Sequence, residues 1–468
     1  MQVTTRFALI ALLTPSFVLA QDRQVSDAMR RFVSVDAQVV ALTHVRVVDG
    51  TGGPVRNDQT IVIDGELIVA VGNASDVRVP PGAREIDLTG HTVIPGIIGL
   101  HDHMYYSMKQ MPVSYPRLFL GNGVTTIRTT GSINTYSELN LKRSIDMGQI
   151  AGPEIHATGP YLQGGGTGPG LMYSVSGPED ARRVVRYWAE EGVGWFKAYT
   201  TISRAELGAA IDEAHKHGIK VTAHLCSVTY REAVALGIDN LEHGLTANTD
   251  YMDGKQLDQC PSVSTRAVYG DLDIYGPDVQ QTIREMVDNG VSMTSTLAVM
   301  ELSTPSRVPV DQRVLDALFP GARELVADYY ARGRTSDDEV GIRVLQRAMA
   351  FEREFVRAGG VLAAGSDPCC VSAIAGYADQ RNYELLIEAG FAPETAVQIM
   401  TLNGAKVLGI DDRVGSIVPG MQADMVVLNG DPTTDAGAIK NVVTVFRRGL
   451  GFDPAALIES TNGQVGLQ

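Results

Sequence analysis

The apolar positions of the chain follow two different patterns. Near both ends, short apolar runs are separated by Asp-Gly, Gly-Gly and Gly-Asn breaks, which is typical of antiparallel strands joined by tight turns. These runs are Val39–Leu42, Val45–Val48, Thr60–Ile63, Leu67–Val71, Gly415–Val418, Ala423–Leu428 and Val442–Phe446. Because the two ends share this pattern of short apolar runs and glycine-containing breaks, we predict one small β-sandwich built from residues 38–93 and 409–450. The middle of the chain would be inserted between its two halves.

The middle of the chain, residues 94–408, alternates strand-like apolar runs with segments of helical period. The predicted strands are Ile97–His103, Thr125–Thr130, Glu154–Gly159, Gly194–Tyr199, Lys220–Leu225, Asn240–Leu245, Val291–Leu297 and Val361–Asp367. The clearest helix is expected over Ser203–His217, where Ser203 and Glu206 form a capping box and Gly218 provides the stop. Pro178, followed by two acidic residues, begins another helix.

Eight such strand–helix units predict an α/β fold, a (β/α)8 TIM-like barrel over residues 94–408. The alternative is a doubly wound open sheet. The number of strands and the lack of a Gly-x-Gly-x-x-Gly loop after the first strand disfavour that alternative. The long proline-containing segment from Thr296 to about Asp338 follows the seventh strand, and it is either a substrate lid or a surface insertion.

The first twenty residues have the organisation of a secretory signal peptide. Arg6 precedes the apolar stretch Phe7–Leu13, and Val18 and Ala20 are small residues at the expected cleavage site before Gln21. We therefore expect cleavage after Ala20 and a secreted or periplasmic protein. The alternative is a buried N-terminal helix. No later stretch has the length of a membrane span.

Composition narrows the classes of partner. The chain has 468 residues and a net charge of -15, so it offers no basic excess to neutralise nucleic-acid phosphates. A small-molecule substrate is expected, and a homo-oligomer is compatible with the sequence. Four cysteines without a Cys-x-x-Cys pair argue against a thiolate zinc site. Cys226 and Cys260 could pair in an oxidising compartment, whereas a bridge between Cys369 and Cys370 would be strained.

Histidines gather at the ends of the predicted strands. In a strand, residues two apart point to the same face, so His101 and His103 present two imidazoles side by side. In a barrel, the C-terminal ends of the strands meet at one mouth, where reactive groups collect. The candidate metal ligands at these ends are His101, His103, Lys197, His224, His243 and Asp367. Because the chain has only nine histidines, chance placement of four at one mouth is improbable.

This set of residues resembles the metal-dependent amidohydrolase superfamily, and within it the imidazolonepropionase-like and secreted dipeptidase-like branch. The phrases that carry the resemblance span most of the mature chain: VIPGIIGLHDHM, GVTTIR, AAIDEAHKHGIKVTAHL, NLEHG, LAAGSDP, LNGAKVLGI and VGSIVPGMQADMVVLNGDP. The resemblance also implies the sandwich split between the termini.

The resemblance implies two divalent metal ions. His101, His103 and Asp367 would bind the more buried ion. His224 and His243 would bind the second. Zinc is the first candidate, although imidazole and carboxylate ligands also suit cobalt, manganese or nickel.

Lys197 would be carboxylated and would bridge both ions. A lysine desolvated beside Trp195 and Phe196 can lose its proton, and as a carbamate it becomes an anionic ligand. The alternative is a structural lysine paired with an acid beside a single metal ion.

The implied reaction is hydrolysis of a C–N amide bond in a dipeptide, an N-acyl amino acid or a cyclic amide. A metal-bridging hydroxide would attack the carbonyl carbon, and Asp367 would pass the proton of the water to the leaving nitrogen. A lactone or ester hydrolase on the same scaffold is the alternative, and a non-catalytic binding protein is a third hypothesis.

Tyr230 and Arg231 are candidate substrate-binding residues, because related dipeptidase-like members use a similar position to hold the carboxylate or carbonyl of the substrate. Packing at a helix N-terminus is the alternative. The sequence also departs from relatives at two places. The stretch Gly164–Gly168 lacks the histidine of a Gly-Gly-His-Gly motif, which puts a plain dipeptidase in doubt. Ser227 stands where deaminases usually carry glutamate, which disfavours a deaminase.

Overall fold

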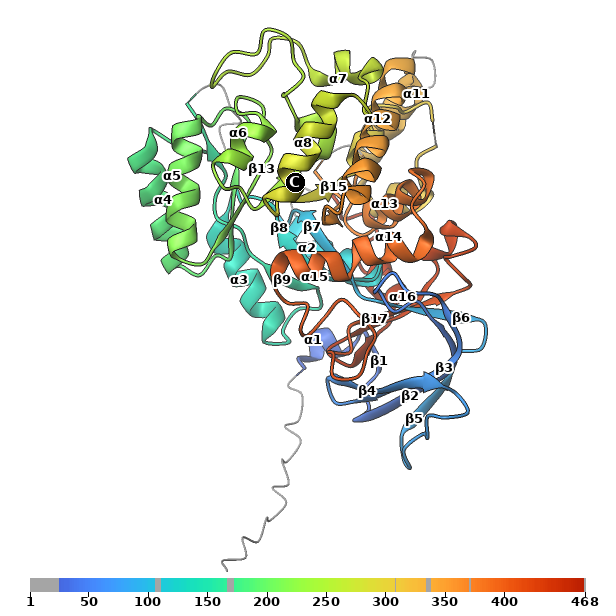
Figure 1. Cartoon of the computed structure of the whole chain (residues 1–468). Helices are drawn as coiled ribbons and strands as arrows, with labels where there is room; N and C mark the ends of the chain where they lie inside the picture. Colours follow the sequence, from blue (N-terminus) through green and yellow to red (C-terminus); the bar gives the residue numbers. More distant parts are fainter. Residues whose placement is uncertain are drawn as a thin grey trace, which may run out of the picture.

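The computed structural model describes residues 25–105, 111–165, 172–307, 309–333, 338–369 and 372–466. The predicted signal peptide over residues 1–20, positions 166–168 of the glycine-rich stretch, and Cys370 lie outside these ranges. The described part is an α/β fold. Figure 1 shows a β-rich part, built from both ends of the chain, beside a larger part in which helices surround short strands.

The β-rich part is a nine-stranded sheet. Its strands are β1 (Val33–Val35), β2 (Val39–Val47), β3 (Arg56–Asp64), β4 (Leu67–Asn73), β5 (Arg84–Asp87), β6 (His91–Pro95), β17 (Met425–Asn429), β18 (Val442–Arg447) and β19 (Leu450–Phe452). The order is β1-β19-β18-β17-β6-β2-β3-β4, with β5 beside β2. Strands β6 and β17 pair antiparallel from Pro95–Met425 to His91–Asn429, so the two ends of the chain share one sheet.

Apolar side chains of this sheet pack into a cluster of their own, which includes Val40, Leu42, Ile61, Ile63 and Phe446. Alternate positions of a strand face one side, so valine and isoleucine at these positions produce a dry face. The prediction that strands from both termini combine is confirmed by the pairing of β6 with β17. Their arrangement as a sandwich stays a prediction.

The predicted strands of this sheet differ from the observed ones at two places. The runs Val39–Leu42 and Val45–Val48 belong to one strand, β2, whose register with β3 shifts between Leu42 and Val45. His44 lies there with a φ of 57°, a left-handed conformation that marks a bulge rather than a turn. The predicted strand Gly415–Val418 is wrong, because this segment is irregular and Gly415 has a φ of 96°.

The larger part contains two parallel sheets. The first has the order β7 (Ile97–Asp102), β8 (Val124–Thr129), β9 (Glu154–His156). The second has the order β11 (Tyr173–Ser174), β10 (Leu162–Gln163), β12 (Trp195–Ala198), β13 (Lys220–Ala223), β14 (Asn240–Glu242), β15 (Ser292–Ser295), β16 (Leu362–Ala364). Each of the eight predicted strands of the middle region overlaps one of these strands, and only the short β10 and β11 were not expected.

The two parallel sheets meet at two places. A parallel bridge joins Thr158, just after β9, to Trp195 at the start of β12. Beyond β16, the amide of Asp367 donates a 2.7 Å hydrogen bond to the carbonyl of His101 in β7. Strand β7 therefore lies beside the chain that leaves β16, and β9 lies beside β12.

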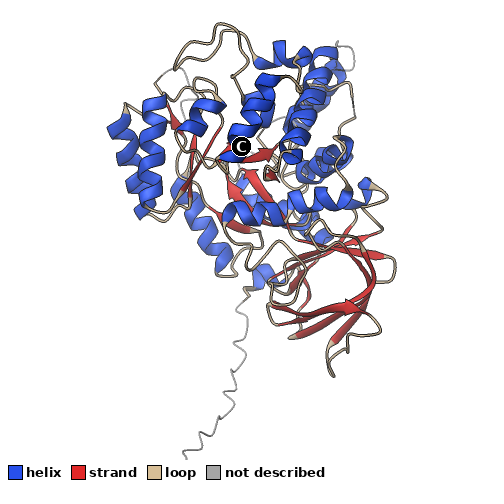
Figure 2. Ribbon diagram, viewed as in Figure 1, coloured by secondary structure: helices blue, strands red, loops and turns tan. Residues whose placement is uncertain are grey.

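Helices separate most of these strands and lie outside them (Figure 2). The α-helices are α1 (Asp27–Arg30), α2 (Met111–Gly121), α3 (Thr135–Asp146), α4 (Pro178–Glu190), α5 (Arg204–Lys216), α6 (Tyr230–Ala235), α7 (Thr265–Val268), α8 (Pro277–Asp288), α9 (Leu297–Glu301), α10 (Gln312–Ala317), α11 (Pro320–Gly333), α12 (Glu339–Arg357), α13 (Tyr377–Glu388), α14 (Pro393–Met400), α15 (Leu402–Leu408) and α16 (Pro454–Glu459). The 3-10 helices are η1 (Gly244–Ala247), η2 (Tyr269–Asp271) and η3 (Ala436–Lys440).

Local sequence accounts for the clearest helix. The hydroxyl of Ser203 accepts a hydrogen bond from the amide of Glu206, and the carboxylate of Glu206 accepts one from the amide of Ser203. Gly218 follows the C-cap with a φ of 69°, so the predicted capping box and stop are both confirmed. Neighbouring α4 begins at Pro178 as expected, and its Arg182 pairs with Asp212 of α5.

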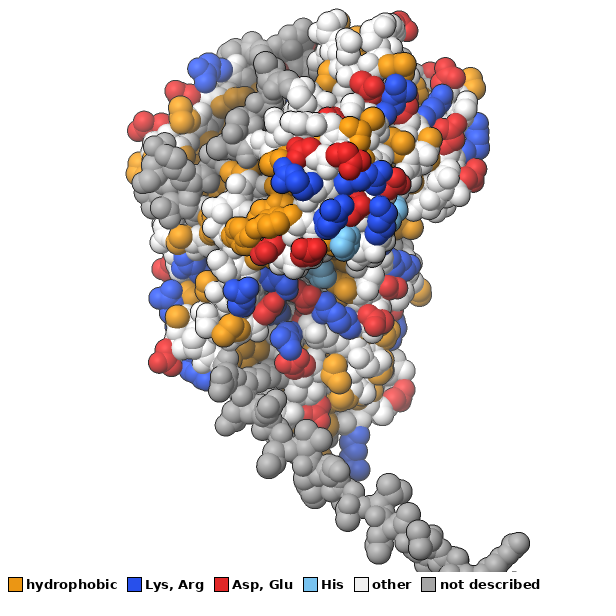
Figure 3. Space-filling view, turned by 90° about the vertical axis from the view of Figure 1, so that its left-hand side faces the viewer, with side chains coloured by type: hydrophobic (Ala, Val, Ile, Leu, Met, Phe, Trp, Pro, Cys, Tyr) orange, Lys and Arg blue, Asp and Glu red, His pale blue; other side chains and the backbone are white. Residues whose placement is uncertain are grey.

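The outer face formed near α4 and α5 carries interspersed basic and acidic side chains rather than one continuous basic surface (Figure 3). Within the described ranges, no helix combines the length and the apolar character that crossing a membrane requires. The segment predicted as a lid or insertion contains α9, α10 and α11. Position 308 and positions 334–337 of that segment lie outside the described residues, and its role as a lid stays a prediction.

Candidate metal centre

The six predicted ligand residues line one cavity of about 480 Å³. One lies in β7 and one in β12, and the other four lie in the chain just after β7, β13, β14 and β16, at the C-terminal ends of parallel strands. The residues are His101, His103, Lys197, His224, His243 and Asp367. Sequence positions as distant as 101 and 367 are therefore brought to the same end of the parallel strands, as the strand-end argument predicted.

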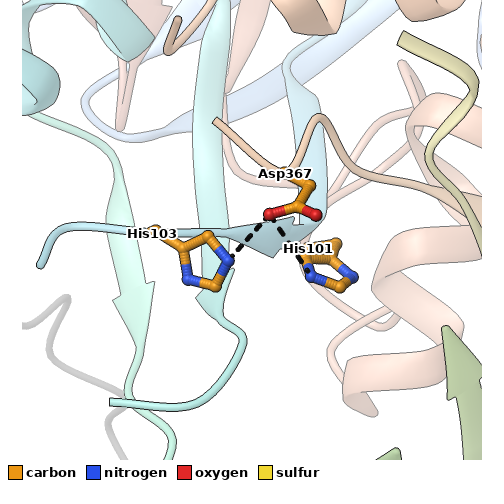
Figure 4. Close-up of side chains that lie close together, drawn as sticks. All are labelled: His101, His103 and Asp367. Atoms are coloured by element: carbon orange, nitrogen blue, oxygen red, sulfur yellow. Dashed lines mark hydrogen bonds and ion pairs between the residues drawn. The ribbon is translucent and has the colours of Figure 1, made fainter. Parts of the chain in front are cut away.

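Three of the six form a compact group (Figure 4). One potential ligand atom from each of His101, His103 and Asp367 lies within 4.8 Å of the other two. Asp367 Oδ1 is 3.0 Å from His103 Nε2 and 3.8 Å from His101 Nε2. Both imidazoles are almost fully buried, whereas the side chain of Asp367 is 14% exposed to the cavity. Two imidazoles and a carboxylate at these distances are a suitable donor set for a divalent cation.

Lys197 contacts the same ring nitrogen of His101 that faces Asp367. Its Nζ donates a 3.0 Å hydrogen bond to His101 Nε2, and it is 5.5 Å and 5.7 Å from the ring centres of Tyr161 and Tyr199. Burial lowers the pKa of the Lys197 ammonium to about 8, although Glu242 opposes this shift. The lowered pKa increases the neutral fraction of this amine at neutral pH, and the neutral amine is the form that carbamate formation requires.

His224 and His243 complete the group. Their ring centres are 4.3 Å apart, and the ring of His243 is 4.4 Å from that of His101. His243 Nδ1 is 2.8 Å from the hydroxyl of Thr296, whereas its Nε2 has no hydrogen-bond partner among the residues that the structure describes. A buried ring nitrogen without a partner is costly unless a ligand occupies it, so its position favours metal coordination.

The protonation states also suit a metal. Burial lowers the pKa of His103 to about 4 and that of His224 to about 3, so both rings are neutral at pH 7. For Asp367, burial raises the pKa, but His101 and His103 outweigh burial and hold it well below the usual range. Neutral imidazoles and an ionised carboxylate are the forms that bind cations. The residues present therefore fit divalent metal ions.

A buried ion pair beneath the group was missed by the sequence analysis. Glu242 Oε2 accepts a 2.7 Å hydrogen bond from His101 Nδ1, and Glu242 Oε1 accepts one of 2.5 Å from Arg128 Nη2. Both Glu242 and Arg128 are completely buried. Arg128 also lies over the ring of Trp195, 4.5 Å from its centre. Charged residues inside otherwise buried strands, one of them directly before His243, were the signal that could have revealed this pair.

This pair determines how His101 faces the cavity. Because Nδ1–H is held by a carboxylate, Nε2 carries the lone pair and points toward Lys197 and Asp367. Burial raises the pKa of Glu242, but the Arg128 guanidinium and His101 outweigh burial and lower it to about 2. Glu242 is therefore ionised under His101 and favours its coordination.

Tyr230 and Arg231 lie elsewhere. The buried hydroxyl of Tyr230 is 2.6 Å and 2.8 Å from the carbonyl oxygens of Glu242 and Gly244, the residues on either side of His243. Arg231 Nε donates to the hydroxyl of Thr282 in α8. Neither residue lines the cavity of the six candidates. These contacts match the packing alternative at the start of α6, and the substrate-binding role stays a prediction.

Two residues just after His224, Cys226 and Ser227, were also singled out in the sequence. Cys226 and Cys260 form a disulfide, with their Cα atoms 5.0 Å apart, so the pairing left open by the sequence is present. The bond ties the segment after His224 to the loop before α7, and this loop lines the cavity. Ser227, at the position where deaminases usually carry glutamate, donates its hydroxyl to the carbonyl of Ile202 instead.

A family model for the amidohydrolase family matches residues 92–451. The chain belongs to the amidohydrolase family. As an amidohydrolase it is a hydrolase that acts on carbon–nitrogen bonds, in agreement with the prediction. The enamidase of Eubacterium barkeri is 24% identical over 407 residues, a stretch that covers 82% of this chain and 86% of the enamidase.

Solved structures show the same fold as this amidohydrolase. A prolidase-like protein from Bifidobacterium longum matches with a TM-score of 0.66 and 26% identity, covering 91% of this chain and 99% of that one. A Xaa-Pro dipeptidase with methionine bound in its active site matches with a TM-score of 0.66 and 21% identity, covering 89% and 100%.

Proposed function

We propose that this amidohydrolase is a binuclear metal-dependent enzyme that hydrolyses a small-molecule amide. The observation that carries the proposal is the convergence of three buried imidazoles, the half-buried imidazole of His224, an ionised aspartate and a buried lysine on one cavity. A cavity of about 480 Å³ is within the range that binds small molecules. Both the enamidase and the dipeptidase named above break a carbon–nitrogen bond, which supports an amide rather than a lactone.

The proposed ligands divide into two sets. His101, His103 and Asp367 would hold the more buried ion, which their mutual distances support. His224 and His243 would hold the second ion, and Lys197, carboxylated on Nζ, would bridge the two. The lowered pKa of Lys197 supports that modification. Zinc is the metal that imidazole and carboxylate ligands suit first. When bound, the ions would acidify a water molecule and polarise the scissile carbonyl.

The side chains of the protein would then move the proton. Asp367 lines the cavity, and its Oδ1 is already held by His103, whereas its Oδ2 is 4.0 Å from His243 Nε2. Oδ2 is therefore the atom that would take the proton of the attacking water and deliver it to the leaving nitrogen. Glu242 keeps the proton of His101 on Nδ1 throughout and so keeps that ring oriented.

The same proposal includes the architecture around the site. The contacts of Thr158 with Trp195 and of Asp367 with His101 support closure of the parallel strands into a (β/α)8 barrel over residues 94–408. The nine-stranded sheet supports a separate terminal domain over residues 38–93 and 409–450, for which we propose the sandwich arrangement. The disulfide between Cys226 and Cys260 supports export to an oxidising compartment after cleavage behind Ala20.

Metal depletion and restoration test the proposal. The purified protein is treated with a chelator, then restored with zinc, and assayed on dipeptides, N-acyl amino acids, cyclic amides and lactones. Restored protein should hold two ions per chain, hydrolyse amides, and show the mass of a carbamate on Lys197 under native conditions. Asp367→Asn should lower kcat by about 100-fold to 10,000-fold. Full amide hydrolysis by metal-free protein would contradict the proposal.

A further inference from the structure

The cavity of the six candidate ligands has a second side, formed by loops. The segment after β14 contributes Thr246 and Thr249, and the loop tied down by the disulfide contributes Pro261 and Val263. Of the lining residues that the structure describes, Asp367 alone is acidic, and it is engaged with His103. Lys197 is buried against His101. The charge that remains accessible on the wall is therefore the guanidinium of one further residue, Arg266.

Arg266 is held in place through its backbone. It lies in the short helix α7, where its amide donates to the hydroxyl of Ser264 at 3.2 Å. The hydroxyl of the preceding Thr265 donates to the carbonyl of Thr246 at 2.7 Å, which ties α7 to the segment that follows His243. The loop before α7 is also fixed by Cys260. Arg266 is therefore attached to the strand end that carries a candidate metal ligand.

The guanidinium of Arg266 is exposed and makes no hydrogen bond or ion pair with the described part of the chain. Other arginines near cavities of this protein are paired, as Arg381 is with Glu301 and Glu384. Hydroxyl groups of Ser264 and Thr265 line the cavity beside Arg266. An unpaired guanidinium on the wall of a reaction cavity, with hydroxyls around it, is suited to a planar anion that can accept two parallel hydrogen bonds.

We propose that Arg266 binds a carboxylate of the substrate. This inference rests on the proposed function and narrows it: the preferred amides are N-acyl amino acids and dipeptides with a free carboxylate, not neutral cyclic amides. The apolar side chains of Pro261, Val263, Val299 and Met300 line the same cavity and would contact the uncharged part of the substrate. A neutral amide would leave the guanidinium without its partner and would lose this interaction.

Matched pairs of probes test the proposal. The zinc-loaded full chain is assayed on N-benzoyl derivatives of glycine, alanine, leucine, phenylalanine and proline, each as the free acid and as the carboxamide. In Arg266→Met, kcat/KM for the acids should fall by about 10-fold to 100-fold, mainly through KM, as expected for loss of a charge-assisted hydrogen bond. The carboxamide series should change by less than about twofold, because it never used the charge.

Two variants control for charge and folding. Arg266→Lys keeps the charge without the planar fork and should give an intermediate loss for the acids. Arg284→Met removes an exposed arginine from α8, away from the cavity lining, and should leave both series unchanged. Equal metal content and equal thermal midpoints of all variants establish that they are folded. An equal loss for acids and carboxamides, or no loss for either, would overturn the proposal.

A binding measurement distinguishes failure of the proposed hydrolase function from failure of the proposed carboxylate site. If neither series is hydrolysed, calorimetric titration of the same proteins with N-benzoylglycine and N-benzoylglycinamide decides the matter. Tighter binding of the acid by the unmodified chain and by Arg284→Met, with about 10-fold weaker binding by Arg266→Met, would retain the carboxylate site without the hydrolase. Equal affinities for the two probes, or no binding of the acid, would overturn the carboxylate site itself.

Discussion

The terminal sheet and the parallel strands both have fully buried centres, but they bury different chemistry. The terminal sheet packs side chains such as Val40, Ile61 and Ile63 against one another. The parallel strands bury Arg128 and Glu242 directly beneath the candidate metal ligands. The apolar core of the terminal sheet stabilises the fold because it removes apolar surface from water. The polar core of the parallel strands is stable only while each buried charge keeps its partner. The polar core is the part of the molecule that lies beneath the candidate metal ligands.

The largest expected difference between the two regions concerns the buried ion pair. Arg128→Met leaves the buried carboxylate of Glu242 without its guanidinium partner, so the free energy of unfolding should fall by about 3–5 kcal/mol, measured by denaturant titration. Adding Glu242→Gln to the same chain should recover part of the loss, because a neutral amide is less costly to bury. Arg183→Met, which removes an exposed arginine paired with Asp180, is the control and should leave stability unchanged. Equal stability of Arg128→Met and this control would contradict the comparison.

The pH dependence of stability is a second difference between the two regions, because the larger part of the molecule buries titratable side chains. Burial of Glu138, in α3, raises its pKa from 4.5 to about 8. Between these values the folded protein keeps a proton that the unfolded chain releases, so the contribution of Glu138 to stability is fully present below pH 4.5 and is lost as the pH rises toward 8. Relative to Glu138→Gln, the unmodified chain should lose up to about 1.4 kcal/mol per pH unit in this window.

The measurement for Glu138 is the free energy of unfolding at several pH values in both proteins. The exposed Glu190→Gln in α4 serves as the control and should follow the unmodified chain. A parallel pH dependence of Glu138→Gln and the unmodified chain would show that this carboxyl does not hold its proton on folding.

Loss of the negative charge beneath His101 should have a smaller effect, on the affinity for metal ions. Glu242→Gln keeps a hydrogen-bond acceptor for His101 Nδ1 but removes the negative charge. The affinity of metal-free protein for zinc, measured by competition with a chelating dye, should fall by about 10-fold to 100-fold. Glu179→Gln, on the exposed first turn of α4, should bind zinc as the unmodified chain does. Unchanged affinity in Glu242→Gln would remove Glu242 from the support of the site.

The smallest effect belongs to the apolar core. Ile63→Val in β3 removes one buried methylene from the terminal sheet and should lower the free energy of unfolding by about 0.5–1.5 kcal/mol. Zinc affinity should stay the same, because Ile63 belongs to the apolar cluster of the terminal sheet, which is separate from the candidate ligands. A change in zinc affinity would show that the two regions are coupled and would weaken the comparison.

The eight predicted strands of the middle region all overlap observed strands, because their prediction rests on local patterns. Apolar runs of the right length are buried wherever they lie, so His101 and Asp367 could be located at strand ends without knowledge of the rest. Turn positions were harder. His44 adopts a left-handed conformation inside a continuous strand, and Gly415 adopts one where a strand was predicted. One residue in the left-handed region of backbone conformation is enough to turn a predicted turn into a bulge or to end a predicted strand. The neighbouring residues in the sequence do not show where such a residue lies.

The sequence alone determined which side chains stand at the C-terminal ends of the parallel strands, because continuous apolar runs of strand length become buried strands and the polar residues that follow each run mark its end. Only the tertiary structure decided which other side chains contact these strand-end residues or line their cavity. Glu242 meets His101 across 141 positions of the chain, Tyr230 packs beside His243 instead of facing the cavity, and Arg266 faces it. These contacts depend on how loops and neighbouring strands lie in space, and local hydrophobic periodicity carries no information about that.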